Sequence, residues 1–146
     1  MNPVPHKLQG IVSGLHHVAI VVESIEKARA VYEGAFGMSG TAVEFVPDQK
    51  VNVLVVHAGS QRIELVEPAS EASPVTGFLK KRGPGLHHLA YKVEDCARAI
   101  AACKAAGMRM IDEAPRPGAH HCRIAFVHPS ATGGVLTELV EDPHSH

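Results

Sequence analysis

An internal repeat is the feature that most constrains how this chain folds. Residues 15–36 align with residues 86–107 at an offset of 71 positions, and nine of the 22 aligned pairs are identical. The segment Ile-Glu-Leu-Val-Glu at 63–67 then recurs as Thr-Glu-Leu-Val-Glu at 137–141, at an offset of 74. Because both matches occur in the same order, the sequence predicts a duplicated structural unit.

The first copy predicts one strand, one helix and three further strands. A β-branched run opens it, Ser24 is suited to cap the helix, and Gly37 is suited to end it. The expected bounds are 15–22 for the first strand, 25–35 for the helix, and 42–46, 51–57 and 61–66 for the later strands.

The second copy repeats this order after a linker with a short helix at 75–82 that Gly83-Pro84-Gly85 closes. Asp95 is suited to cap its helix, and Gly107 follows the helix end. The expected bounds are 86–93 for the first strand, 96–106 for the helix, and 108–111, 123–127 and 135–140 for the later strands.

The chain of 146 residues is long enough for one ordinary domain. Because each module is too small to bury a core of its own, we expect an α+β fold in which two tandem βαβββ modules pair with each other. Residues 15–141 are the expected domain, with modules 15–68 and 86–141 and a linker at 69–85. Residues 1–14 are an expected N-terminal extension, and 142–146 an expected tail.

Four side chains of metal-ligand type occupy equivalent places in the two copies. Strand side chains alternate between faces, so only one histidine of each His-His pair can face a shared site. Glu64 and Glu138 lie in mid-strand between residues that favour burial, where an ionised carboxylate needs a compensating cation. No basic residue accompanies these strands in duplicated register. The set His17, Glu64, His88 and Glu138 suits Zn²⁺, Co²⁺, Ni²⁺ or Mn²⁺.

The other histidines and the cysteines have less specific interpretations. His16 and His87 are expected on the helix-facing side, as packing or hydrogen-bonding groups. The cluster His120-His121-Cys122 lacks a duplicated counterpart and is expected to be a surface loop. The cysteines Cys96, Cys103 and Cys122 are expected to be buried thiols, and His144 and His146 to belong to the tail.

Composition excludes several classes of function. The net charge of −1 provides no basic stripe for nucleic acid, and the absence of Trp argues against base-stacking platforms. The longest apolar runs are too short to cross a bilayer, and the N-terminus lacks the pattern of a secretory signal. We expect a cytoplasmic protein without nucleic-acid or membrane partners.

Three stretches carry a resemblance to a known family. They are Leu-His-His-Val-Ala-Ile-Val-Val at 15–22, Ile-Glu-Leu-Val-Glu-Pro at 63–68 and Gly-Leu-His-His-Leu-Ala at 85–90. Together they resemble the vicinal oxygen chelate superfamily, which includes glyoxalase I. The segments 112–118, 126–129 and 132–141 are most similar to its methylmalonyl-CoA epimerase family. This resemblance implies a glyoxalase/bleomycin-resistance-like fold, in which the two modules form a curved mixed sheet around one metal site. It also implies that one divalent metal binds there in an open cleft.

The resemblance also implies an activity. We expect a metal-dependent isomerase that interconverts (2R)- and (2S)-methylmalonyl-CoA through an enolate. Some epimerases carry an additional strand glutamate proposed to move a proton, but Val53 stands at that place here. We therefore expect Glu138 to loosen its metal contact and act as one acid/base, with Glu64 as its counterpart.

Other departures from the epimerase pattern concern the substrate. Lys50 stands where glycine is usual, Ser130 replaces a common lysine, and Ala119-His120-His121 would make the cleft rim bulkier. Arg116 and residues 80–82 are either CoA contacts or solvated surface. Alternatives are a glyoxalase I-type lyase or isomerase on a glutathione or other thiol adduct, a ring-cleaving dioxygenase, and a metal-free protein that sequesters ligands. The family also implies a homodimer.

Overall fold

The computed structural model describes residues 10–144, which divide into two compact units. Among these residues, the N-terminal unit is His17–His87, and the C-terminal unit combines residues 10–16 with residues 88–144. Strand β1 (Val12–Val21) therefore passes from one unit to the other after His16, and strand β6 (Gly85–Val93) does so after His87. No helix in this part of the chain is long and apolar enough to cross a membrane.

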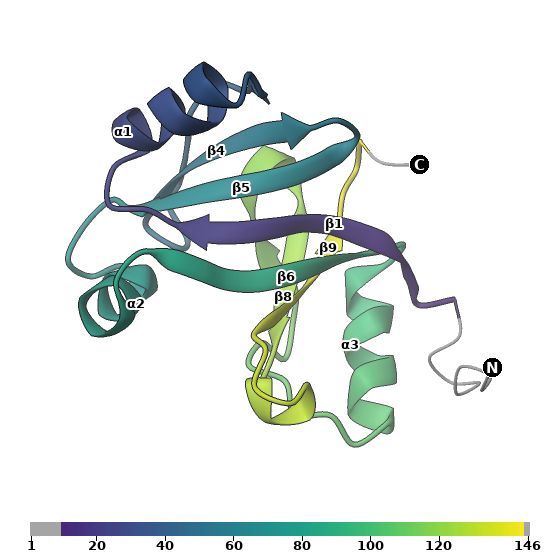
Figure 1. Ribbon diagram of the computed structural model, residues 1–146. Helices are drawn as coiled ribbons and strands as arrows, with labels where there is room; N and C mark the ends of the chain where they lie inside the picture. Colours follow the sequence, from purple (N-terminus) through teal and green to yellow (C-terminus); the bar gives the residue numbers. More distant parts are fainter. Residues whose placement is uncertain (1–9, 145–146) are drawn as a thin grey trace. The chain divides into compact units, whose positions relative to one another are not determined.

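In the N-terminal unit the strands follow the order β2-β4-β5-β1. Figure 1 shows β4, β5 and β1 in this order. Strand β5 (Gln61–Pro68) runs parallel to β1 and antiparallel to β4 (Val51–Ala58). Two short strands, β2 (Ser39–Gly40) and β3 (Glu44–Val46), pair antiparallel with different parts of β4.

Helix α1 (Ile25–Arg29) begins where the sequence predicts it and continues as η2 (Ala30–Ala35) with π-helical geometry. The Ser24 hydroxyl accepts a hydrogen bond from the Lys27 amide at 3.2 Å. In the last turn the amide of Phe36 donates to the carbonyl of Val31, five residues earlier. The apolar side of α1 covers β4 and β5 with a core of Val22, Ile25, Leu54, Val56 and Leu65.

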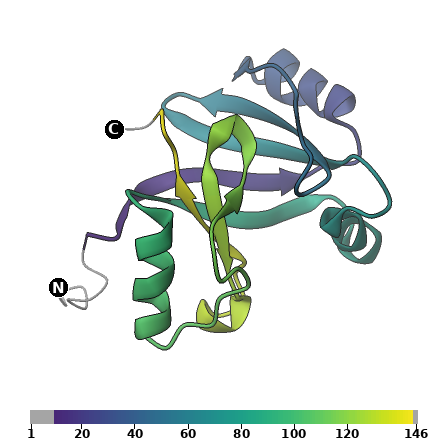
Figure 2. The same ribbon diagram turned by 180° about the vertical axis from the view of Figure 1, so that it is seen from behind.

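The C-terminal unit repeats this plan with the strand order β6-β9-β8-β7. Its helix, drawn in green, can be seen from behind in Figure 2. Strand β9 (Thr137–Glu141) is parallel to β6 and antiparallel to β8 (Arg123–Val127), and β8 also pairs with β7 (Arg116–Pro117). The parallel pair of the first unit therefore has an equivalent in the second. The predicted α+β class and the duplication are confirmed.

Helix α3 (Cys96–Ala105) starts at the predicted cap, because the Asp95 carboxylate accepts a hydrogen bond from the Arg98 amide at 3.0 Å. Gly107 follows the helix end with φ +83°, a left-handed conformation that glycine adopts at little cost. Helix α3 packs on β8 and β9 around a core of Val93, Cys96, Ala99, Ile100, Cys103, Met110, Ala125, Val127 and Leu139.

Three short helical segments complete the description. Helix α2 (Pro74–Arg82) lies in the predicted linker, and the Ser73 hydroxyl caps it by accepting from the Val75 amide. The turns η3 (Ala119–His121) and η4 (Pro129–Ala131) flank β8.

The predicted strand at 108–111 is wrong. Its backbone makes one isolated bridge, between Met110 and Val127, and no continuous ladder. The amide of Met108 still closes the end of helix α3 by donating to the carbonyl of Cys103. The amides of Ile111 and Asp112 both donate to the carbonyl of Phe126, so the segment is too short and too bent to extend as a strand.

Candidate functional site

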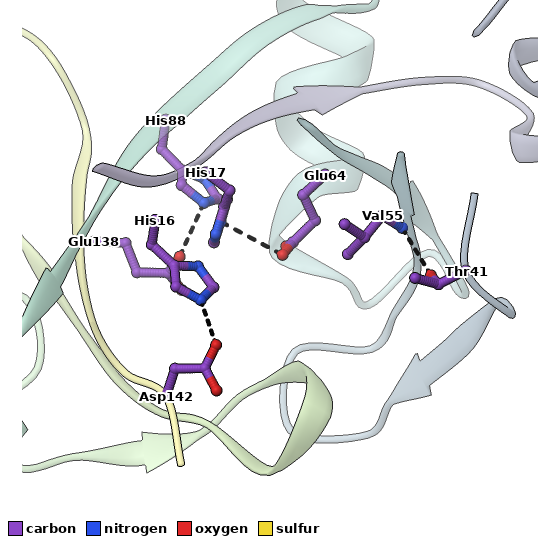
Figure 3. A network of polar contacts seen from close by, with 8 residues as sticks. All are labelled: His16, His17, Thr41, Val55, Glu64, His88, Glu138 and Asp142. Carbon is purple, nitrogen blue, oxygen red and sulfur yellow. Dashed lines mark hydrogen bonds and ion pairs between the residues drawn. The ribbon is translucent and has the colours of Figure 1, made fainter. Parts of the chain in front are cut away.

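The N-terminal unit brings His17 and Glu64 together. The parallel register of β1 and β5 aligns Ala19 with Glu64, so His17, two residues earlier, lies on the same face as the carboxylate. The Nε2 atom of His17 is 3.4 Å from the Oε2 atom of Glu64 (Figure 3). The histidine is buried, and 15% of the glutamate side chain is exposed.

The C-terminal unit contains the equivalent pair. Strands β6 and β9 align Ala90 with Glu138, and the Nε2 atom of His88 lies 3.2 Å from the Oε1 atom of Glu138 (Figure 3). Both side chains are buried. The ring of Phe126, which lies opposite Glu138 in the β8–β9 register, packs edge-on against the His88 ring with centroids 5.2 Å apart.

Both pairs have the spacing expected of two ligands on one cation. Ligand atoms bound at about 2.0–2.2 Å to a tetrahedral metal are about 3.3–3.6 Å apart. The observed separations of 3.4 and 3.2 Å agree with this to about 0.1 Å. Imidazole nitrogen with carboxylate oxygen is also a donor combination that borderline divalent metals accept. Each unit therefore supplies a pair of ligand-type side chains that could hold a divalent cation, fully buried in the C-terminal unit and partly exposed at Glu64 in the N-terminal unit.

The neighbouring histidines face away from these pairs, as their alternation along the strand predicts. The ring of His87 packs edge-on against Phe78 of helix α2, with centroids 4.9 Å apart. The Nε2 atom of His16 lies 2.7 Å from the Oδ2 atom of Asp142 (Figure 3). The prediction that His16 and His87 are packing or hydrogen-bonding groups is confirmed, by packing for His87 and by hydrogen bonding for His16.

The cysteines are buried thiols, as expected. Burial, together with the nearby Glu141 carboxylate, raises the pKa of Cys96 to about 12. Burial also raises the pKa of Cys103. Neither thiol of helix α3 therefore ionises near neutral pH, which excludes them as nucleophiles or as ready metal ligands.

The segment His120-His121-Cys122 is only in part the surface loop that the sequence predicts. His121 is exposed, but Cys122 is buried against Ala90, Ile124 and Val140. Asp142, assigned to the tail, is held by His16 and by the amide of His144, which donates to its carboxylate at 2.8 Å. His146 lies outside the described residues.

Two residues near these groups were missed from the sequence. Phe126 could have been found by pairing its strand with the segment that carries Glu138, since opposed residues share a face. Asp142 directly follows the last glutamate of the repeat, but its partner His16 is 126 positions away and no repeat relates them. Only the folded chain reveals that contact.

Comparison with known proteins identifies the family. Residues 16–126 match the Glyoxalase/Bleomycin resistance protein/Dioxygenase superfamily, and the chain belongs to it. The uncharacterized protein YqjC of Bacillus subtilis is 43% identical over 127 residues, which are 87% of this chain and 91% of the relative. The ethylmalonyl-CoA/methylmalonyl-CoA epimerase of Cereibacter sphaeroides is 38% identical over 131 residues, covering 88% and 98% of the two chains.

A solved structure supports the same assignment. The crystal structure of methylmalonyl-CoA epimerase from Mycobacterium tuberculosis matches with a TM-score of 0.87 and 35% sequence identity. The match covers 92% of this chain and 91% of that chain. The predicted vicinal oxygen chelate fold is therefore confirmed.

Proposed function

We propose that this protein is a metal-dependent epimerase that interconverts (2R)- and (2S)-methylmalonyl-CoA through an enolate. The epimerase names of the Cereibacter and Mycobacterium proteins support an acyl-CoA substrate. The observation that carries the proposal is the duplicated pair of imidazole and carboxylate, His17 with Glu64 and His88 with Glu138. A protein that only needed this fold would have no reason to bury both pairs.

The proposal assigns all four side chains to one divalent cation, which would be Co²⁺, Zn²⁺, Ni²⁺ or Mn²⁺. Duplication of the ligand positions supports this, and so does the ligand-like spacing within each pair. When bound, such a cation supplies positive charge beside the developing enolate oxygen.

Proton transfer falls to the two glutamates. Val53 lies opposite Glu44 in the β3–β4 register and carries no group that could accept a proton. We assign Glu138 as one acid/base and Glu64 as its counterpart. In each turnover the ionised glutamate takes the α-proton and leaves the enolate. The other, protonated glutamate then donates a proton to the opposite face of the same carbon, so the substrate is inverted without net oxidation or reduction.

Proton-exchange NMR tests substrate, reaction and metal dependence together. The protein is incubated in D₂O with (2R)- or (2S)-methylmalonyl-CoA, with and without added Co²⁺. We expect exchange of the α-proton and appearance of the other epimer. Chelation should abolish both, and added Co²⁺ should restore them. Turnover of a glutathione hemithioacetal without α-exchange in methylmalonyl-CoA would contradict the epimerase and favour the glyoxalase-type alternative.

A single substitution tests the acid/base assignment. We expect Glu138→Gln to retain much of its bound metal and to lose epimerisation by about 10²–10⁴-fold, the usual contribution of a positioned base. Glu141→Gln is the matched control, because Glu141 lies on the same strand and caps helix α3 instead. Unchanged turnover in Glu138→Gln would contradict the assignment.

The proposal also includes a homodimer, as the family resemblance implies. Light scattering on the purified protein should give twice the chain mass of 15.5 kDa. A monomer that remains fully active would show that the activity does not need a second copy.

A further inference from the structure

A second group of metal-ligand side chains lies within the C-terminal unit, apart from the His–Glu pairs. It consists of His16, Cys122 and Asp142. Each offers a ligand atom, and these atoms all lie within 4.8 Å of one another. The side chains of His16 and Asp142 are only 8% and 7% exposed, and Cys122 is buried. Three different ligand types therefore converge in a nearly dry environment.

Separate parts of the fold bring these residues together. His16 lies in β1, on the face opposite His17. Cys122 lies directly before β8, where its amide donates to Ala119 and its carbonyl accepts from Gly118. Asp142 directly follows β9, where the amide of His144 orients its carboxylate.

The equivalent positions of the other unit do not form such a group. His16 corresponds to His87 in the repeat, and His87 packs on Phe78. The register of each antiparallel pair gives the other two counterparts. Arg123 lies opposite Glu141 and Asn52 opposite Glu67, so Cys122 corresponds to Val51 and Asp142 to Pro68. The N-terminal unit thus keeps the histidine, as His87, and lacks both other ligands.

We propose that His16, Cys122 and Asp142 form a second metal site, which binds Zn²⁺ with water as the fourth ligand. The site joins the middle of β1 to the chain that follows β9, directly before His17, where the N-terminal unit begins.

The donor chemistry selects the metal. A cysteine sulfur together with imidazole and carboxylate is a soft-to-borderline set, which favours Zn²⁺ over Mg²⁺, Ca²⁺ or Mn²⁺. In tetrahedral geometry, nitrogen and oxygen ligands lie about 3.3 Å apart, and sulfur lies about 3.6 Å from either. The His16–Asp142 separation of 2.7 Å is that of a hydrogen bond, so it must widen by about 0.6 Å when a cation replaces the shared proton.

Cobalt spectroscopy distinguishes this site from the His–Glu pairs, since only this one contains sulfur. The chelator-treated, reduced protein is titrated with Co²⁺ alone under anaerobic conditions. We expect two equivalents to bind and a thiolate-to-cobalt charge-transfer absorption to appear in the near ultraviolet. Cys122→Ser should remove that absorption and one equivalent. The matched control Cys103→Ser, at another buried thiol, should remove neither.

Two further variants keep the test informative. Asp142→Asn conserves side-chain size, so it covers the case in which Cys122→Ser does not fold, and we expect it to bind one equivalent and to lose the thermal stabilisation by Zn²⁺. His88→Ala should remove the other equivalent and leave the sulfur absorption intact. A wild-type protein that binds one equivalent without sulfur absorption overturns the second site and leaves the epimerase proposal standing. Absorption that persists in Cys122→Ser also overturns it.

Discussion

Adjacent histidines on one strand have different tasks, because successive side chains face opposite sides. His17 meets Glu64, whereas His16 meets Asp142. The sequence predicts which histidine of each pair faces its glutamate, since the repeat places the same residues in the same register twice. It could not predict that His16, Cys122 and Asp142 meet, because two of these residues have no ligand-type counterpart in the repeat.

The buried thiol of Cys96 makes the free energy of unfolding depend on pH in the alkaline range. In the folded protein the pKa of Cys96 is about 12, above its ordinary value of 9.0, because burial and the Glu141 charge oppose ionisation. The thiol of the unfolded chain ionises first as pH rises. The contribution of Cys96 to the free energy of unfolding is therefore fully present below about pH 9 and is lost between about pH 9 and about pH 12. We expect a loss on the order of 1 kcal/mol per pH unit in this range.

Urea midpoints of the wild type and Cys96→Ala at pH 8, 9 and 10 check this expectation. The difference between the two proteins cancels the titration of all other groups, so it should shrink as pH rises. A difference that stays constant with pH would show that the folded thiol ionises as readily as the unfolded one.

At the scale of elements, each copy of the repeat starts its helix in the same way. A short polar side chain caps the helix, and the second glutamate of the repeated strand motif accepts from the first helical amide. Glu67 accepts from Ile25 at 3.1 Å, and Glu141 accepts from Cys96 at 2.9 Å. The caps were predictable from local sequence. The glutamate contacts were not, because they join residues 42 and 45 positions apart.

The sequence also fails to predict three elements correctly, and each failure has a local cause. The turn of π-helical geometry at the end of the first helix has no sequence signal comparable to a cap. The two-residue strand β7 contains Pro117, which cannot donate to a ladder, so it gives almost no strand pattern. The segment at 108–111 has the apolar residues of a strand, but backbone bonds to helix α3 and to Phe126 prevent it from extending.

The cap of helix α3 gives a prediction at this scale. Asp95→Ala removes the carboxylate that accepts from the Arg98 amide, and we expect it to lower the free energy of unfolding by about 1 kcal/mol. Asp95→Ser is the matched control, because serine is also a good cap and should restore most of the loss. Chemical denaturation followed by circular dichroism measures both. Equal destabilisation by both substitutions would mean that the carboxylate acts by another route.

For the stability of the whole molecule, the strands that the chain path shares between the two units matter more than either hydrophobic core alone. Each unit has its own hydrophobic cluster, one built around Leu54 and Leu65 and the other around Ile100 and Leu139. A core of about 70 residues is only marginally stable by itself. Strands β1 and β6 each supply residues to both units. Loss of either core therefore releases part of a strand that the other unit uses.

We accordingly expect both units to unfold in one cooperative transition. The chain has no Trp and two Tyr, with Tyr32 in the N-terminal unit and Tyr91 in the C-terminal unit, so Tyr91→Phe and Tyr32→Phe each leave one fluorescent reporter. Leu54→Ala, at a fully buried position of the N-terminal core, should cost about 2–5 kcal/mol. Combined with each reporter variant, it should lower both urea midpoints equally. A shift confined to the Tyr32 reporter would instead show that the units unfold independently, and that a strand shared along the chain is not enough to couple them.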